Sequence, residues 1–258
     1  MNRAVDVASD RAFFGVAALL FAGSVAATVA WCTSMPPLCG MAMPGDWTMS
    51  MTWMRIPGQT WPRAAAEFLS MWTVMMMAMM LPSLVPMLWR YRSAVRTTSE
   101  AQLGWLTGMV GGGYFLVWML LGLAAYPLGV TLATLEMELP ALARAVPLAV
   151  GVVVLIAGAL QFSAWKAHYL ACCREAPRSD RVLPADVGMA LRYGLRLGLD
   201  CAGCCGGLMA ILLVIGVMDL RAMAAVTAAF TVERLAPAGE RVARGSVVTG
   251  KTLAAANS

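Results

Sequence analysis

The sequence predicts an all-α fold, a polytopic bundle of about six transmembrane helices with both ends of the chain in the cytoplasm. Three observations lead to this prediction. Hydrophobic residues make up 60% of the chain and charged residues 13%, about half of the charged share in soluble domains. Apolar stretches of about 18 residues or more recur, which is the length of a membrane-crossing helix. These stretches lack the alternation of polar and apolar residues that marks a membrane β-barrel.

Six apolar stretches qualify as spans. The first follows Arg3 and Arg11 and ends in ATVAW, which resembles a signal-peptidase site. The run is longer than the apolar core of a signal peptide, so we expect it to stay uncleaved. The third contains glycines suited to close helix packing, and a very short turn separates the last two. The expected spans are 12–31, 65–89, 103–130, 142–165, 188–217 and 219–236.

Basic residues set the orientation of the chain and limit its partners. With the N-terminus inside, fifteen of the 19 Lys and Arg residues lie inside, in line with the positive-inside rule. The four outside are Arg55, Arg63, Arg144 and Arg221. We expect one membrane domain over 1–238, with an extracytoplasmic loop at 32–64, and a polar cytoplasmic tail at 239–258. The basic residues form no single patch, so the lipid bilayer is an expected partner and nucleic acid is not.

Methionine is concentrated in the second expected span. The stretch MWTVMMMAMMLPSLVPM, residues 71–87, contains seven of the 21 methionines. Thioether sulfur is a soft ligand that suits Cu(I), whereas methionine also fills irregular gaps in ordinary cores, and both interpretations stay open. Pro82 and Pro86 should kink this helix. Six methionines fall within about half of the helix circumference, namely Met71, Met75, Met76, Met79, Met80 and Met87.

A cysteine motif lies well inside the fifth expected span. In DCAGCCGGLM, residues 200–209, Cys201, Cys204, Cys205 and Met209 fall within a sector of about 140° on a helical wheel. Three thiols on one face suit a trigonal or partial tetrahedral soft-metal site. The alternative is that small residues simply line a helix contact. Asp200, an acid within the membrane, is a candidate for the same site or for cation passage, unless it pairs with Arg196.

The outer loop is rich in sulfur. It contains Cys32 and Cys39, which can form a disulfide in an oxidising compartment, and Met-x-Met pairs typical of a Cu(I) capture surface. The alternative is a loop folded back onto the membrane, with Trp47 and Trp53 at the interface. The methionines of this loop are Met35, Met41, Met43, Met49, Met51 and Met54.

The inner side offers a smaller group of candidate ligands. His168, the one histidine of the chain, is close in sequence to Cys172 and Cys173, so it is either a ligand beside two thiols or a solvated side chain. Glu233, near the end of the last expected span, should pair with Arg234 or with another cation of the inner face.

Three motifs together resemble one family, the bacterial predicted metal-binding integral membrane proteins, a domain of unknown function. They are MWTVMMMAMMLPSLVPM, GLDCAGCCGGLMA and the pair GVMDLRAM and VERLAP, and the resemblance covers roughly residues 65–240. It implies metal binding in a bacterial inner membrane, but neither an ion nor a reaction. Cys173 and the glycines at 206 and 207 depart from the family pattern. The residues that match are Met71, Met75, Met76, Met79, Met80, Pro82, Met87, Cys201, Cys204, Cys205, Met209, Glu233 and Cys172.

The leading hypothesis is the handling of a soft cation, with Cu(I) first. The ion would be captured outside, transferred to the intramembrane sulfur site, and stored, passed on or delivered to a copper-requiring partner protein. Few histidine or carboxylate ligands accompany these motifs, which argues against Zn, Fe and Mn. One alternative is a membrane copper oxidoreductase, or its subunit, acting on an apolar substrate, although such sites favour imidazole ligands. Another is a structural subunit of a membrane complex. No ATP-binding motif is present, so pumping by this chain alone is not expected.

Overall fold

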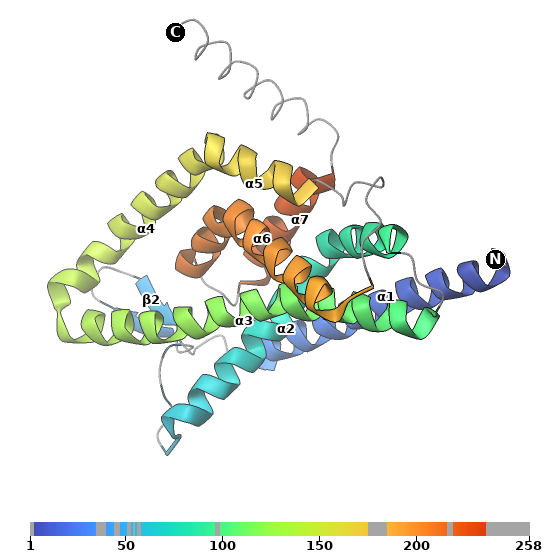
Figure 1. The fold of residues 1–258 in the computed structure, drawn as a ribbon. Coiled ribbons are helices and arrows are strands. Elements are labelled where there is room, and N and C mark those ends of the chain that lie inside the picture. The colour runs from blue at the N-terminus through green and yellow to red at the C-terminus, as the bar shows by residue number, and fades with distance from the viewer. Residues whose placement is uncertain are drawn as a thin grey trace, which may run out of the picture.

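The computed structural model describes residues 3–34, 40–43, 47–50, 53, 55, 58–95, 99–174, 185–215 and 219–235. Helices occupy most of these residues. A small antiparallel hairpin comes between the first two helices in chain order (Figure 1). In chain order the elements are α1 (Arg3–Ser34), β1 (Gly40–Met43), β2 (Trp47–Ser50), α2 (Trp61–Ala94), α3 (Glu100–Glu138), α4 (Pro140–Leu160), α5 (Ala164–Arg174), α6 (Val187–Ile215) and α7 (Leu220–Leu235).

The helical class is confirmed, and five helices of the described part are long and apolar enough to cross a membrane. They are α1, α2, α3, α4 and α6, which correspond to the first five expected spans. The sixth, expected at 219–236, is the helix α7 of 16 residues. This helix is shorter than the roughly 17–25 residues of a typical membrane-crossing helix, and it is not among the five. By length and composition, five helices of the described part could therefore cross a membrane.

The connections between helices differ from the expected ones at two places. The third helix does not end at 130 but runs on to Glu138, so the segment LEMELP is largely helical. Leu139 alone links α3 to α4, because Pro140 suits the first turn of a new helix and cannot continue the old one. The fourth helix ends at Leu160, and residues after a short turn form the separate helix α5.

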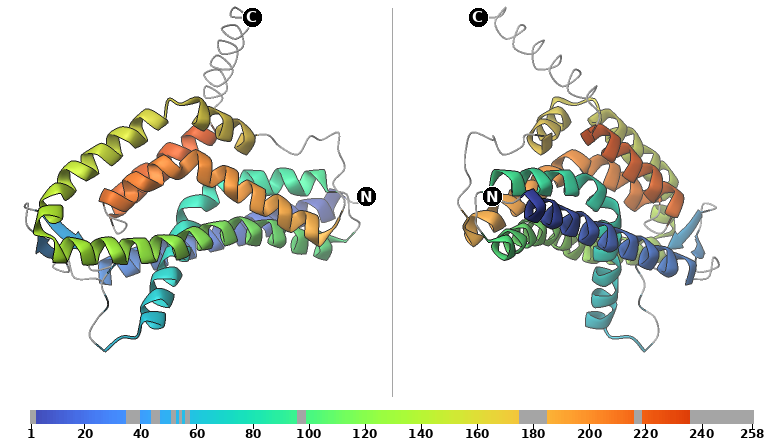
Figure 2. Two further views of the ribbon diagram at one scale, coloured as in Figure 1. Left: turned by 60° about the vertical axis from the view of Figure 1, so that its left-hand side comes forward. Right: turned by 90° about the vertical axis from the view of Figure 1, so that its right-hand side faces the viewer.

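The helix α2 forms the centre of the bundle. In the most apolar 18-residue stretch of α2, 61% of the residues are buried. The corresponding stretches of α1 and α4 have 11% of their residues buried. All six methionines of the expected sulfur face are buried, together with the cysteines of α6 in one core. The helix changes direction part-way along its length (Figure 2), as expected from Pro82 and Pro86 inside it.

A glycine contact sets α6 against α3, the most extensive helix pair in the molecule. A Cβ atom added to Gly194 of α6 would lie 2.2 Å from the backbone oxygen of Val110, and one added to Gly113 of α3 would lie 2.7 Å from that of Leu191. Any side chain at these two positions would force the backbones apart. This close approach brings the cysteine motif of α6 next to α3.

The hairpin packs against the end of the bundle where α3 meets α4. Met43 is buried beside Ala133 and Ala143, and the indole nitrogen of Trp47 donates a hydrogen bond of 2.9 Å to the carbonyl of Ala143. The described part of the outer loop thus agrees with a loop folded back onto the helices. In the register of the hairpin, Met41 is the partner of Met49.

Some expectations fall outside the described residues. These are the Cys32–Cys39 disulfide, because Cys39 is not described, and the outer-loop methionines Met35, Met51 and Met54. The polar tail at 239–258 is also outside them.

Candidate metal centre

The helix α6 carries the cysteine motif on its buried face. Cys201, Cys204, Cys205 and Met209 expose 0%, 3%, 0% and 6% of their surface. Because α6 is one continuous helix over these residues, positions three and four residues apart fall on the same side. The shared sulfur face expected from the sequence is therefore present. Metal binding by it stays a prediction.

Two other helices contact Cys201. The Sδ atom of Met80, from α2, lies 3.9 Å from the Sγ atom of Cys201, and the hydroxyl of Tyr114, from α3, lies 2.9 Å from the same sulfur. Cys205 also interacts with Cys201, and its sulfur lies 3.6 Å from that of Cys204. A methionine of the expected sulfur face thus reaches the cysteine motif directly.

A buried arginine ties further sulfur to this group. The Nη2 atom of Arg234, from α7, donates to the sulfurs of Cys173 at 3.6 Å, Cys204 at 3.8 Å and Cys205 at 3.6 Å. Its Nη1 atom donates to the hydroxyl of Ser83 at 3.0 Å. Cys173 comes from α5 and is 1% exposed. We call Met80, Cys173, Cys201, Cys204 and Cys205 the sulfur cluster.

The charge of Arg234 makes the sulfur cluster chemically distinctive. Guanidinium stays protonated in proteins, and this one is 5% exposed. Within the described residues no carboxylate forms an ion pair with it, because Glu233 binds Lys166 instead, with a distance of 2.7 Å between carboxylate oxygen and ammonium nitrogen. A buried charge without a counter-charge is costly. The cation therefore favours negative charge on the adjacent sulfurs, and thiolate is the form of cysteine that binds metals.

The sulfur cluster has donor atoms that suit copper, but it does not have a preformed coordination geometry. Thiolate and thioether are soft ligands that suit Cu(I), and thiolate also binds zinc. Within the described ranges, no group of three or more His, Cys, Asp or Glu side chains is arranged so that it holds a metal ion. Three of the thiols instead surround one nitrogen of the guanidinium, Nη2 of Arg234. A metal ion bound by all three would therefore have to replace these contacts.

The remaining expected ligands take different positions. Asp200 is half-buried while the neighbouring Cys201 is fully buried, so its carboxylate lies at the edge of the sulfur cluster. His168 is exposed on α5, with its Nε2 atom 3.8 Å from the sulfur of Cys172, and contributes no imidazole to the cluster. Five methionines lie in the same core without an assigned ligand role, namely Met71, Met75, Met76, Met79 and Met87.

Sequence reasoning missed four participants, Cys173, Arg234, Ser83 and Tyr114. The signal for Cys173 was available, because Lys166, Leu170 and Cys173 follow helical spacing and are all buried. From the sequence, Cys173 is instead grouped with His168 and Cys172 on the inner side, and it is treated as a departure from the family pattern. Of the two partners expected for Glu233, the cation of another element is the observed one.

A comparison with protein families identifies the chain. One family profile, described as PpoB2, copper chaperone, matches residues 69–256, well over half of the chain. The chain belongs to the PpoB2 copper chaperone family. PpoB2 membership makes copper the metal and copper handling the general function, which agrees with the expected metal-binding resemblance. The PpoB2 match includes both the methionine run and the cysteine motif. Comparisons with curated proteins and with solved structures found no match.

Proposed function

We propose that the chain is a membrane-embedded Cu(I) chaperone of the bacterial inner membrane. It binds Cu(I) at the sulfur cluster and delivers it to a copper-requiring partner protein. The observation that supports this proposal best is the convergence of four thiols and one thioether, from α2, α5 and α6, around a buried arginine. Oxygen and nitrogen ligands are scarce there, so a soft monovalent ion suits the site better than Zn, Fe or Mn.

The guanidinium of Arg234 has a definite part in this proposal. It stabilises the thiolates that the ion needs, and it stays close enough to offset the charge of the loaded site. Removal of the ion leaves the thiols hydrogen-bonded to Arg234 instead of unpaired. The same residue thus supports both the loaded and the released state, as a protein that must give its cargo away requires.

A cavity supplies the route to the buried sulfurs. It has a volume of about 390 Å³, lies between α4 and α6, and is lined by Cys204 together with Gln161, Lys166 and Gly206. Cys204 is the member of the motif that borders this space. We propose that copper enters and leaves the cluster here. Capture of Cu(I) by the outer methionine pairs, Met41/Met43 and Met49/Met51, remains part of the proposal.

Copper loading of the purified protein tests the proposed function. Wild-type protein in nanodiscs should bind Cu(I) in competition with a Cu(I) chelator, and X-ray absorption should show sulfur in the first shell. The triple variant Cys201→Ser, Cys204→Ser and Cys205→Ser should lose this binding. Cys172→Ser is the matched control, because Cys172 is a cysteine outside the cluster. A first shell of nitrogen and oxygen alone would refute the proposal.

Delivery requires a separate experiment. The loaded protein should transfer Cu(I) to an apo copper-binding acceptor faster than a chelator buffer at the same free Cu(I) concentration does. Equal rates would mean that the ion simply dissociates, and the chain would then be a store rather than a chaperone.

A further inference from the structure

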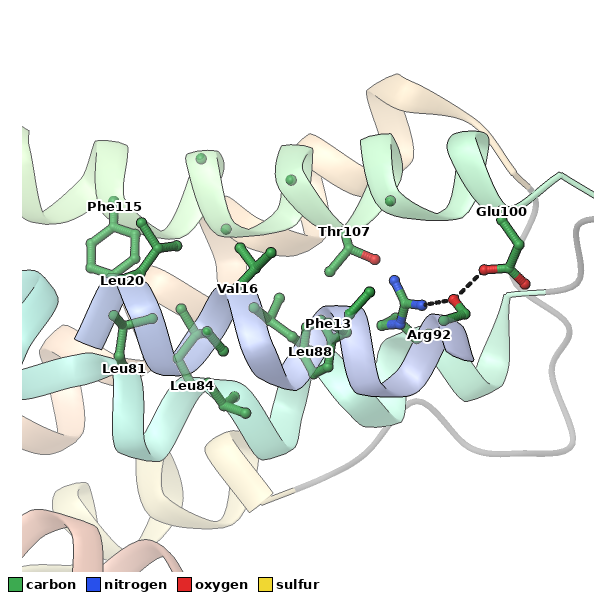
Figure 3. A pocket seen from close by; sticks show the side chains of 18 of the residues that line it. Phe13, Val16, Leu20, Leu81, Leu84, Leu88, Arg92, Glu100, Thr107 and Phe115 are labelled. Carbon is green, nitrogen blue, oxygen red and sulfur yellow. Dashed lines mark hydrogen bonds between the residues drawn. The ribbon is translucent and has the colours of Figure 1, made fainter. Parts of the chain in front are cut away.

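A second and larger cavity lies between α1, α2 and α3 (Figure 3). Its volume is about 850 Å³. Leu81, Leu84 and Leu88 of α2 form its floor, and Phe13 and Leu20 of α1 form one wall. We call this cavity the apolar groove.

Four glycines contribute to the wall of the apolar groove on α3. A Cβ atom added at Gly104, Gly108, Gly111 or Gly112 would meet no atom within 4 Å. These glycines differ from Gly113 on the same helix, which is pressed against α6. Glycine here does not serve a helix contact within the described chain. It keeps a channel open along α3.

One end of the apolar groove is polar and carries both signs of charge. Arg92 is 9% exposed, and its Nη2 atom donates to the hydroxyl of Ser9 at 2.8 Å. Ser9 in turn donates to the carboxylate of Glu100 (Figure 3). The Nε atom of Arg92 is buried and has no hydrogen-bond partner among the described residues. The polar end therefore pairs a cation with donor capacity to spare and an exposed carboxylate.

We propose that the apolar groove binds a phospholipid whose head group contains both a phosphate and a primary ammonium, which is phosphatidylethanolamine. Its phosphate would bind Arg92, the side chain suited to phosphate oxygens, and its ammonium would bind Glu100. One acyl chain would lie along the floor between α1 and α3. An anionic glycerol head group matches the site less well, because it meets the Glu100 carboxylate without an ammonium to bind it.

The apolar groove has the size of a small-molecule site. Its volume of about 850 Å³ lies within the range of such sites, and its wall on α1 rises about 17 Å from Ser9 to Leu20. By the expected orientation Arg92 and Glu100 are at the cytoplasmic end, so the lipid would come from the inner leaflet. This inference is independent of copper binding.

Lipid retention tests the inference. The full chain is reconstituted in nanodiscs of equal parts phosphatidylethanolamine and phosphatidylglycerol, transferred to mild detergent, and examined by native mass spectrometry. Wild-type protein should retain phosphatidylethanolamine in preference. Gly108→Leu, which fills the groove, should abolish retention. Gly151→Leu on α4 is the matched control, because a Cβ atom there also meets nothing within 4 Å and the position lies outside the groove.

The head-group assignment has its own variants. Arg92→Gln should lower retention of phosphatidylethanolamine about tenfold, which corresponds to ~1.4 kcal/mol. Glu100→Gln should remove the preference over phosphatidylglycerol. Circular dichroism on heating checks folding, and Gly112→Leu replaces Gly108→Leu if the latter fails to fold.

Three outcomes would overturn the inference. They are equal retention of both lipids by the wild type, unchanged retention in both glycine variants, and a change of oligomeric state caused by Gly108→Leu. The last would show that the groove binds a second copy of the chain.

Discussion

At the scale of single residues, Arg234 connects more members of the site than any one sulfur does. It contacts three thiols and the hydroxyl of Ser83 from a buried position. A buried cation of this kind contributes little to stability and often costs stability, because its desolvation outweighs its contacts. Its value to the protein must then lie in the chemistry of the neighbouring sulfurs.

Replacing Arg234 should separate the effect on stability from the effect on copper affinity. Arg234→Met should still fold, since the desolvation of a buried guanidinium without a carboxylate partner among the described residues is costly in the wild type, and the adjacent thiols can stay neutral in the variant. Its Cu(I) affinity should fall by about tenfold or more. Thermal unfolding and chelator competition measure the two effects. Arg221→Met is the control, because Arg221 is an exposed arginine on the same helix. Unchanged copper affinity would show that the guanidinium is purely structural.

The methionines of α2 allow a second test at this scale. Replacing Met75, Met76, Met79 and Met80 by leucine should preserve insertion and purification, because such volume-conserving swaps cost less than ~1.5 kcal/mol each. Leucine cannot coordinate a metal, and Met80 is the methionine in contact with Cys201. We therefore expect weaker copper binding, and Met80→Leu alone should account for most of the loss. Full copper stoichiometry and affinity in the quadruple variant would leave the run as packing.

At the scale of the elements, glycines decide where helices touch and where space remains. Gly194 and Gly113 allow α3 and α6 to meet backbone to backbone. Gly206, on the same α6, has open space instead, on the cavity that reaches Cys204. One helix thus combines a close contact on one side with an opening on another.

The opening can be closed by a single change. Gly206→Leu should slow Cu(I) loading of the protein while the final stoichiometry stays the same, because the side chain fills the route and not the ligand set. Stopped-flow measurement of copper transfer from a chelator gives the rate, with Gly151→Leu as the control. A normal rate in Gly206→Leu would place the route elsewhere.

At the scale of the whole molecule, the orientation in the membrane stays a prediction from the distribution of basic residues. Reporter fusions after Arg96 and after Arg181 should both report the cytoplasm. A reporter signal outside at either site would reverse the topology, and it would also put the polar end of the apolar groove in the outer leaflet.

The sequence allowed prediction of features that repeat along one helix. The shared face of Cys201, Cys204 and Cys205 follows from helical periodicity alone, and so does the burial of the methionine stripe. Contacts between helices far apart in the chain have no such local signal. The meeting of Cys173 and Arg234 with the cysteine motif depends on how α5, α6 and α7 pack, which periodicity does not encode. The choice between the two expected partners of Glu233, which pairs with Lys166, depends on helix packing in the same way.

The position of Arg234 has a consequence for which ions the protein accepts. A site in which two of the four thiols bind the ion as thiolates would, beside one guanidinium, have a single negative charge in excess. A monovalent ion neutralises this excess, whereas a divalent ion leaves a net positive charge in a buried place, which is costly. Zinc also binds thiolates well, so sulfur by itself does not separate the two metals. The arginine is a permanent positive charge already in the site. It would therefore disfavour zinc through the net charge of the loaded site, which ligand softness alone does not do.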